Sequence, residues 1–376
     1  MYLNNFVKKI AAVITGTSLA MALAGCSSPI QLGSSGSVEN GTITQSGTQV
    51  LMDTVCSYSL TFDADYAEDA NADKVFGIGE MLETCMLARN AGASETTLIN
   101  VGGVNEEGYE LSEDFEKYIA ACLELSESSE GAFDITLGML TDLWNINEYV
   151  DDSENYTLPD SMFVAQYLEM CGYDKIEIAN HKLLMHEKVY LDFGAVGKGI
   201  HLQKVYEGFK DSNLHGGVVT AGGSVLVMGE KLDGSDWYVG VVDPFNPGTF
   251  NTYLVLQGDW FVSTSGDYER YVMVDDVRYH HILDGSTGYP AQSGLRSVTV
   301  LMPAEYSEEF LTNNKHGITD SSLNGLLSDA LSTAVFVMGE EKGMALAVEY
   351  GAEVFVVRED GTTNMTFGMN RYIKRY

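Results

Sequence analysis

Short β-type runs separated by turn residues limit the fold of this chain more than any other feature of its sequence. From about Lys175 onward, apolar and β-branched residues alternate with Gly, Asp and Pro in a pattern typical of strands. The predicted strands are residues 176–179, 189–193, 218–227, 237–242, 252–256, 272–274 and 354–357. Apolar residues at helical spacing predict helices at 75–90, 112–128, 198–209, 323–338 and 341–350. Because the helices are clustered and do not alternate regularly with the strands, we predict an α+β fold with mixed β-sheets.

The beginning of the chain resembles the leader of an exported protein. Lys8 and Lys9 precede an apolar stretch at residues 10–24, which is too short to remain as a membrane-spanning helix. It ends in Leu-Ala-Gly-Cys at residues 23–26, which resembles the lipobox of bacterial lipoproteins; an ordinary signal peptide that contains a cysteine is the alternative. We expect residues 1–25 to be a lipoprotein signal peptide and Cys26 to be lipidated, so that the protein is extracytoplasmic and lipid-anchored to the cell membrane.

Composition divides the rest of the chain into a tether and one domain. Residues 26–48 are rich in Ser, Gly, Thr and Asn, which predicts a flexible tether. The folded domain is expected at residues 49–376, with an acidic surface loop at 151–160. The wide cysteine spacing contains no C-x-x-C and predicts buried free thiols instead of a zinc or redox site; these cysteines are Cys56, Cys85, Cys122 and Cys171. Disulfide pairing in an exported protein is the alternative.

The formal net charge of −33 excludes some classes of partner. A chain this acidic is not expected to bind nucleic acid or to hold anionic lipid through basic residues. Nucleotide binding stays open, because a divalent cation can screen phosphates locally.

A glycine-rich segment at residues 192–199 lies between a predicted strand and a predicted helix. Its glycines permit close approach of a ligand, the helix N-terminus favours anions, and Lys198 adds a positive charge. The spacing matches neither a Walker P-loop nor a dinucleotide-binding motif, and a structural turn is the alternative. Gly222 and Gly223 lie inside predicted strand 218–227 and indicate either a bulge or the close approach of another group.

Two further regions carry polar side chains suited to catalysis or metal binding. Residues 263–267 and 280–288 place hydroxyls, His281 and Asp284 within reach of a predicted hairpin, as a general base with phosphate contacts or as a buried core pair. Asp329 and Thr333 share one face of a predicted helix, with Ser332 close by. Such hard oxygen ligands suit Mg²⁺. The alternative is an Asp near a helix start and a Thr bonded back to its own helix.

Taken in order, these segments resemble the ApbE family, the FAD:protein FMN transferases. The matching stretches are residues 192–199, 220–229, 263–271, 281–291 and 328–339, and a weaker similarity extends from about Leu51 to the C-terminus. The resemblance implies an ApbE-like fold in which FAD lies in a cleft between subdomains and Mg²⁺ binds its pyrophosphate.

The resemblance also implies roles for individual residues. The implied Mg²⁺ ligands are Asp329, Thr333 and the backbone oxygen of Ala195, with Ser332 as a neighbour. The residues implied to contact FAD are Met52, Asn90, Ala132, Phe133, Asp134, Asp192, Lys198 and Ile282.

The implied reaction is a phosphoryl transfer. A threonine hydroxyl of an exported acceptor protein, expected to be a membrane redox subunit, attacks the FMN-side phosphorus of FAD, and AMP leaves. His281, with Asp284, is the candidate base or proton relay. Two alternatives use the same site: an FAD pyrophosphatase with water as the nucleophile, and a lipoprotein that only binds flavin.

Three positions depart from the family pattern. Asp53 replaces the glycine of a Met-Gly-Thr sequence and adds bulk and charge at a bend. Gly285 replaces a proline after Asp284. Asn90 occupies the place where many relatives carry a tyrosine stacked near the flavin, which keeps hydrolysis of FAD open as an outcome.

Overall fold

The computed structural model describes residues 31–39, 41–66, 71–89, 92–246, 248–314 and 320–374. The predicted signal peptide, the predicted lipidation site Cys26 and the position Asn90 lie outside these residues, so their assignments stay predictions. Within the described ranges, no helix is both long enough and apolar enough to cross a membrane.

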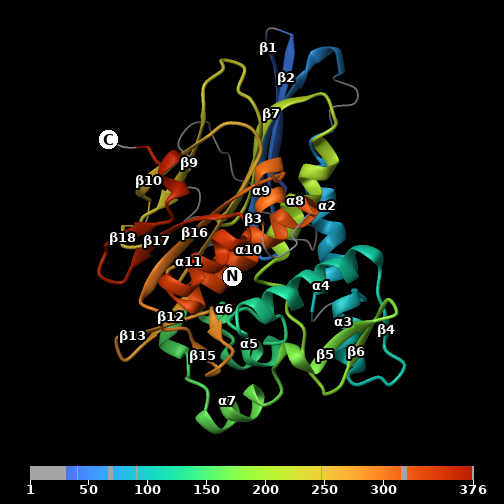
Figure 1. The fold of residues 1–376 in the computed structure, drawn as a ribbon, viewed down its shortest axis with the longest axis vertical. Coiled ribbons are helices and arrows are strands. Elements are labelled where there is room, and N and C mark those ends of the chain that lie inside the picture. Colours follow the sequence, from blue (N-terminus) through green and yellow to red (C-terminus); the bar gives the residue numbers. More distant parts are fainter. Residues whose placement is uncertain are drawn as a thin grey trace.

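A nine-stranded antiparallel sheet forms the centre of the fold (Figure 1). Its strands follow the order β1-β2-β3-β7-β8-β11-β16-β17-β18, and neighbouring strands are antiparallel throughout. They are β1 (Gln31–Glu39), β2 (Thr42–Leu51), β3 (Thr54–Asp63), β7 (Leu214–Ala221), β8 (Ser224–Gly229), β11 (Trp260–Gly266), β16 (Leu295–Pro303), β17 (Glu353–Arg358) and β18 (Thr363–Met365). Alternate residues of β3, including Tyr58, Leu60 and Phe62, are buried in the main core, because one face of the sheet is covered.

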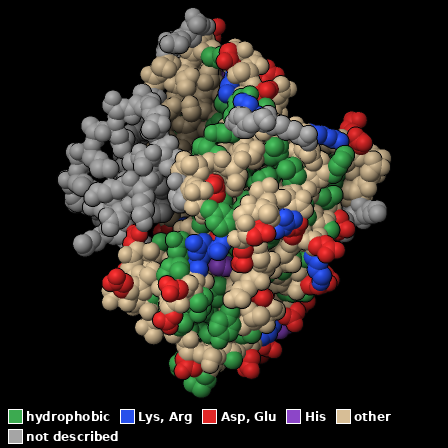
Figure 2. Space-filling model, turned by 90° about the vertical axis from the view of Figure 1, so that its left-hand side faces the viewer, with side chains coloured by type: hydrophobic (Ala, Val, Ile, Leu, Met, Phe, Trp, Pro, Cys, Tyr) green, Lys and Arg blue, Asp and Glu red, His purple; other side chains and the backbone are tan. Residues whose placement is uncertain are grey.

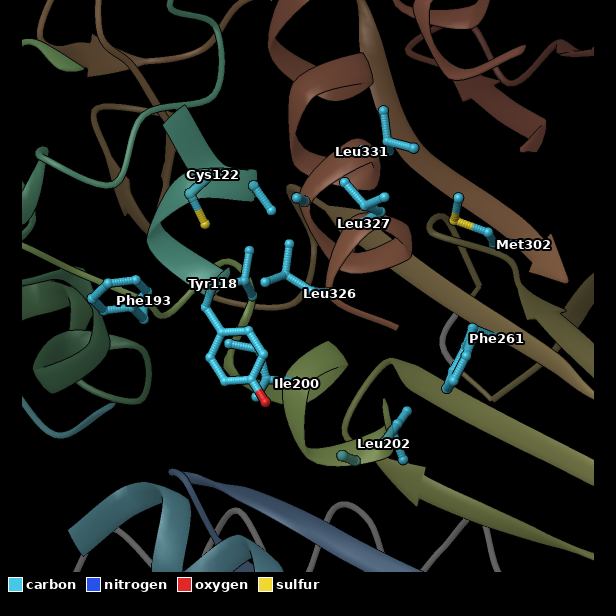
Figure 3. Close-up of a cluster of buried hydrophobic side chains, with 14 of the residues drawn as sticks. Tyr118, Cys122, Phe193, Ile200, Leu202, Phe261, Met302, Leu326, Leu327 and Leu331 are labelled. Carbon is cyan, nitrogen blue, oxygen red and sulfur yellow. The ribbon is translucent and has the colours of Figure 1, made fainter. Parts of the chain in front are cut away.

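Helices cover this face of the sheet. The longer ones are α2 (Lys74–Leu82), α4 (Glu113–Ser128), α8 (Gly197–Phe209), α10 (Asn324–Met338) and α11 (Glu340–Glu349). Helix α10 packs on β11 and β16, and α8 packs on α10, β7 and β8. Figure 3 shows Leu327 and Leu331 of α10, Ile200 of α8 and Phe261 of β11 in one apolar core. Since α10 is buried around almost its whole circumference, it is a central helix and not a surface helix.

A hairpin and the C-terminal segment cover the opposite face. Strands β9 (Trp237–Val242) and β10 (Phe250–Leu256) pair with each other, and Leu254 forms a bridge to Ile373. Their apolar side chains pack with Val262 and Leu301 of the large sheet in a second core.

A smaller region of short elements lies below the large sheet in Figure 1. It contains α3 (Glu95–Gly102), α5 (Gly138–Trp144), α6 (Ile146–Tyr149), α7 (Ser161–Leu168), β4 (Tyr109–Glu110), β5 (Ile176–Ala179), β6 (Lys182–Met185), β12 (Tyr271–Val274), β13 (Val277–His280), β14 (Leu283–Asp284) and β15 (Tyr289–Pro290). A third core, which includes Trp144, Val272 and Leu283, joins α5 to the hairpins β12–β13 and β14–β15. The remaining helix is α9 (Glu308–Asn313).

Most predicted elements are confirmed, and so is the α+β class. The predicted helices correspond to α2 with the following π-helical turn Glu83–Leu87, and to α4, α8, α10 and α11. The strands predicted at 176–179, 237–242, 252–256, 272–274 and 354–357 correspond to β5, β9, β10, β12 and β17. Three of the predicted buried thiols are confirmed, whereas Cys85 is exposed. Figure 2 shows acidic side chains spread over one face with fewer Lys and Arg among them, as a net charge of −33 leads one to expect.

Two strand predictions are wrong. Residues 218–227 are not one strand, because Gly222 and Gly223 form the turn between β7 and β8, with Gly222 at a φ of +56°. Residues 189–193 form no strand; Tyr190 makes a single bridge to Leu137. Their apolar side chains are buried by packing against helices, which a sheet-like pattern does not distinguish from a strand.

The predicted tether at 26–48 is wrong from Gln31 onward. Residues Gln31–Glu39 and Thr42–Leu51 pair as an antiparallel hairpin at the edge of the large sheet. A strand at the exposed edge of a sheet can consist largely of polar residues such as Ser and Thr. Composition alone therefore does not distinguish this hairpin from a flexible segment.

Candidate functional site

Two glycines let α8 and α10 cross in direct backbone contact. A Cβ placed on Gly199 would lie 2.2 Å from the carbonyl oxygen of Gly325, and a Cβ on Gly325 would lie 2.6 Å from that of Gly199. Neither position has room for a side chain, so the approach itself requires glycine. The crossing brings the first turn of α8 beside Asp329 in α10.

Asp329 is a buried carboxylate with three donors around it. Its side chain is 2% exposed, and its Oδ2 lies 3.4 Å from the Lys198 ammonium. The same oxygen accepts the backbone N–H of Gly199 at 3.0 Å, while Oδ1 accepts the Ser224 hydroxyl at 3.1 Å. A buried charge is tolerated when it is paired and hydrogen-bonded in this way. The predicted segments 192–199, 220–229 and 328–339 therefore meet at one carboxylate.

The carbonyl of Ala195 is left available by the same arrangement. In a regular helical turn the N–H of Gly199 would donate to the carbonyl four residues earlier, that of Ala195. Here it donates to Asp329. Within the described part of the chain, no hydrogen bond reaches the Ala195 oxygen. A backbone oxygen thus remains free for a ligand in the turn that precedes α8.

A row of hydroxyls joins β11 to α10 beside Asp329. The Ser265 hydroxyl lies 2.7 Å from that of Ser332 and 3.2 Å from that of Thr333. The Ser332 hydroxyl also donates to the Asp329 carbonyl at 2.7 Å. Ser332, not Thr333, is therefore bonded back to its own helix, and the Thr333 hydroxyl faces β11.

These groups fit a divalent cation that binds mainly to oxygen. Among the described residues, no three His, Cys, Asp or Glu side chains are grouped so as to hold a metal by themselves. The protein offers one carboxylate from Asp329, the carbonyl of Ala195 and the hydroxyl of Thr333. Such a partial set suits Mg²⁺, which usually keeps waters and takes further ligands from substrate phosphates.

A tight turn between β2 and β3 closes one side of the site. Met52 and Asp53 have φ values of +50° and +54°, the backbone of a hairpin turn that favours glycine. The Met52 N–H donates to Glu83 at 3.3 Å, and the Asp53 carbonyl accepts from Arg270 at 3.3 Å. The next residue, Thr54, is buried against Gly222, where an added Cβ would lie 2.6 Å from its hydroxyl. Asp53 therefore lies at the bend, as predicted.

His281 has a defined tautomer. Its backbone N–H and its Nδ1 both lie 3.1 Å from the carbonyl oxygen of Arg270, and a carbonyl can only accept, so Nδ1 carries the proton. Burial, followed by the charge of Arg270, lowers the pKa of His281 to about 3. The ring is therefore neutral near pH 7 and presents the lone pair of Nε2.

Glu269 and Arg270 belong to the site but were not singled out from the sequence. A Cβ on Gly223 would lie 2.8 Å from Oε1 of Glu269, which places this carboxylate against the β7–β8 turn. Burial raises the pKa of the Glu269 carboxyl, and the charges of Lys198 and Arg270 oppose that shift. Both residues lie inside the matching stretch 263–271. Two adjacent charged residues in this stretch are the sequence feature that could have identified them.

The predicted flavin segment is held by its own hydrogen bonds. Phe133 is buried in the main core, and Ala132 is half-buried. The Asp134 carboxylate accepts the backbone N–H groups of Thr136 at 2.7 Å and Tyr173 at 3.0 Å. The Asp134 side chain therefore fixes the loop around it.

Asp284 closes a turn instead of pairing with His281. Its carboxylate accepts the backbone N–H of Ser286 at 2.8 Å and the Ser286 hydroxyl at 2.6 Å. Its carbonyl accepts the N–H of Gly288 at 2.8 Å. The alternative of a buried His281–Asp284 pair is wrong, because each residue has other partners. Ile282, between them, is 5% exposed.

Asp192 lies at the start of the glycine-rich segment and is fixed from two sides. One carboxylate oxygen accepts the N–H of Gly194 at 2.8 Å, and the other lies 3.6 Å from the Arg89 guanidinium. Arg89 in turn contacts Asp142 at 2.8 Å, so this carboxylate is oriented by a short charge network.

Comparisons with known proteins identify the family of the chain. A model of the ApbE family matches residues 52–356. The FAD:protein FMN transferase of Haemophilus influenzae is 25% identical over 367 residues, with 93% of each chain covered. That of Treponema pallidum is 30% identical over 264 residues, 66% of each chain. The crystal structure of the ApbE protein of Thermotoga maritima has a TM-score of 0.73 and 28% identity, and covers 88% of this chain and 100% of that one. The chain belongs to the ApbE family.

Proposed function

We propose that this protein transfers FMN from FAD to a threonine hydroxyl of an acceptor protein, in a Mg²⁺-dependent reaction that releases AMP. One observation carries the proposal: at the crossing of α8 and α10, the Lys198 ammonium lies 3.4 Å from the buried carboxylate of Asp329. The Ala195 carbonyl lies three residues before Lys198, and Thr333 lies four residues after Asp329 in α10. The relatives named above are FAD:protein FMN transferases, which supports the same substrate and the same kind of acceptor.

The reaction balances with one acceptor hydroxyl for each FAD. The threonine oxygen forms a bond to the FMN-side phosphorus, the bond from that phosphorus to the bridging oxygen breaks, and the bridging oxygen leaves on AMP. One proton is released from the hydroxyl. We assign the Nε2 of His281 to receive it, because the bond from Nδ1 to the Arg270 carbonyl leaves the lone pair on Nε2.

The residues of the site divide the remaining work. Lys198 supplies a positive charge for a phosphate oxygen at the N-terminus of α8. When bound, Mg²⁺ would neutralise charge on the pyrophosphate, with Asp329, Ala195 and Thr333 as its protein ligands. Gly222 of the β7–β8 turn lies against the Lys198 side chain, and Ser224 after this turn donates to Asp329. Such positioning supplies a large part of the acceleration in phosphoryl transfer.

We also propose that the protein acts outside the cytoplasm, held to the cell membrane through lipid on Cys26. The support is the Leu-Ala-Gly-Cys sequence at residues 23–26 after an apolar stretch. Labelling cells with a radioactive fatty acid tests this directly: wild-type protein should be labelled and Cys26→Ala should not. An unlabelled wild-type protein contradicts lipidation.

The transferase proposal is tested with the full chain in detergent, FAD, Mg²⁺ and the membrane fraction of the source cells. AMP is measured by chromatography, and covalently bound flavin by fluorescence in a denaturing gel. AMP formed together with a fluorescent protein band supports transfer. AMP with free FMN and no band supports the pyrophosphatase, and the absence of AMP overturns both.

A further inference from the structure

Arg270 is a cation with almost no protein partner. Its guanidinium makes one hydrogen bond within the described residues, to the Asp53 carbonyl at 3.3 Å, and forms no ion pair there. Four of the five other described arginines contact carboxylates, and exposed Arg371 is the exception; the four are Arg89, Arg278, Arg296 and Arg358. A guanidinium has five N–H donors, so most donors of Arg270 are available to a ligand.

Arg270 and Lys198 act electrostatically on the same two groups. The charges of both residues lower the pKa of His281, and both oppose the raised pKa of Glu269. The two cations therefore act on the same two groups from nearby positions.

A continuous line of contacts also connects the two cations. Gly222 lies against Thr54 on one side and the Lys198 stem on the other, with an added Cβ 2.6 Å and 3.6 Å from them. The residue before Thr54 is Asp53, whose carbonyl accepts from Arg270 at 3.3 Å. The paired turns β2–β3 and β7–β8 thus hold Lys198 and Arg270 at fixed positions.

The charges of the two cations are not equally available. Lys198 lies 3.4 Å from the buried Asp329 carboxylate, which offsets much of its charge. Among the described residues Arg270 forms no ion pair, although its charge acts at longer range on the buried Glu269 carboxyl. The Arg270 guanidinium is therefore less closely paired than the Lys198 ammonium and is available to a phosphate that enters this site.

We propose that Arg270 binds the pyrophosphate of FAD opposite Lys198, so that the anhydride to be cleaved lies between two cations. The proposal rests on the proposed function and extends it to a further substrate-binding residue. A planar guanidinium contacts two phosphate oxygens at once, and such contacts stabilise charge that develops when a phosphate leaves. The contact of Arg270 with Asp53 turns its side chain toward the bend where this chain differs from the Met-Gly-Thr pattern.

The first experiment measures binding, so that it does not depend on turnover. Affinities of FAD and riboflavin for the full-length protein are measured by flavin fluorescence in EDTA, for wild type, Arg270→Gln and Arg270→Lys. Arg371→Gln is the control, since Arg371 is exposed and has no role in the site. We expect Arg270→Gln to weaken FAD by about 10- to 100-fold, as for the loss of a charge-assisted hydrogen bond, and riboflavin by less than about 2-fold.

The outcomes separate a phosphate contact from a structural role. Equal losses for FAD and riboflavin, or values for Arg270→Gln equal to those of the control, overturn the proposal. Inhibition of binding by AMP and by FMN identifies the phosphate concerned, because only the ligand whose phosphate contacts Arg270 loses affinity. The two bonds from His281 reach the backbone carbonyl of Arg270, which side-chain substitutions at this position do not remove. Urea unfolding of each variant checks that folding is retained.

A second experiment uses chemical rescue. Addition of millimolar guanidinium to Arg270→Ala should restore part of the AMP formation, whereas sodium at the same ionic strength should not. If wild type forms no AMP, the proposed function fails, while the difference between FAD and riboflavin still decides the role of Arg270. Rescue by sodium as well as guanidinium contradicts a specific contact.

Discussion

The backbone N–H of Gly199 donates to the carboxylate of Asp329 at 3.0 Å, across the crossing of α8 and α10. This one bond satisfies a buried charge and at the same time gives an acceptor to an N–H in the first turn of α8, which has no acceptor within the helix. Both effects require the two helices to touch. The geometry of the site therefore depends on the size of residue 199.

Gly199→Ala should destabilise the protein and disturb the site. The new Cβ would lie 2.2 Å from the Gly325 oxygen and 2.8 Å from the Asp329 Cβ, so the helices must separate. We expect a loss of about 1–3 kcal/mol in the free energy of unfolding, measured with urea. Gly77→Ala is the matched control, because nothing lies within 4 Å of its added Cβ. It should stabilise by about 0.5–1 kcal/mol, as alanine does in a helix.

Asp329→Asn should abolish metal binding while preserving side-chain volume. Mn²⁺ can replace Mg²⁺ as a spectroscopic probe, and free Mn²⁺ is measured by electron paramagnetic resonance. We expect binding to be lost and AMP formation to fall by about 100-fold or more, since the only carboxylate of the proposed ligand set is removed. Glu113→Gln, which alters an exposed pair with Lys117, should leave both unchanged. Normal Mn²⁺ binding by Asp329→Asn would refute the ligand assignment.

Substitutions of Asp284 and of His281 should have different effects on stability and on kcat. Asp284→Ala removes two hydrogen bonds within a turn, at 2.8 Å and 2.6 Å, and should cost about 1 kcal/mol of stability with little change in kcat. His281→Ala should lower kcat by about 100-fold or more, because the proton acceptor is lost. Steady-state kinetics and urea unfolding of both variants check this. A large loss of kcat in Asp284→Ala would restore its predicted catalytic role.

Asp53→Gly should stabilise the protein. Asp53 has a φ of +54°, a conformation that costs free energy for a residue with a Cβ and little for glycine. We expect a gain of about 0.5–1 kcal/mol, partly offset by the greater freedom of glycine in the unfolded chain. Urea unfolding measures it, with Asp233→Gly in an exposed turn as the comparison. A loss of stability would mean that the Asp53 side chain has a favourable contact.

His281 should make stability sensitive to acid. Its pKa is about 3 in the folded protein and 6.5 ordinarily, so the unfolded chain binds the proton first as pH falls. Its contribution is intact above pH 6.5 and is lost progressively as pH falls from there toward 3. The free energy of unfolding of His281→Gln should therefore decline less steeply over this interval than that of wild type. His215→Gln, at an exposed histidine, should follow wild type.

Helices and strands were predicted correctly where the spacing of apolar side chains matches the face of the element that is buried. Helix α4 has one buried face, and its apolar residues recur at helical spacing, so its bounds were close. Residues 218–227 are apolar on both sides of Gly222, because both faces of β7 and β8 are covered. The turn between these strands was missed because it contains no charged residue to mark it. The β1–β2 hairpin failed for the opposite reason, since an edge strand needs no apolar pattern.

The site was predictable in its motifs and not in its contacts. Asp329, Thr333 and Lys198 lie in stretches with a recognisable order, and the structure brings Lys198 to Asp329 and Ser265 to Thr333. The bond from Gly199 to Asp329 depends on two helices far apart in the chain, so local spacing does not reveal it. Arg270 was missed because it stands out only by forming no ion pair among the described residues, and ion pairs are known only from the folded structure.

The β1–β2 hairpin shortens the reach of the domain from the bilayer. If Cys26 carries the lipid, only the residues between it and Gln31 separate the anchor from the sheet, and a fully extended chain of that length spans about 18 Å. A tether that continued to residue 48 would have allowed about four times that distance. The first strand of the sheet would then begin within the shorter of these two distances from the membrane, which limits the acceptor threonines that the site can reach.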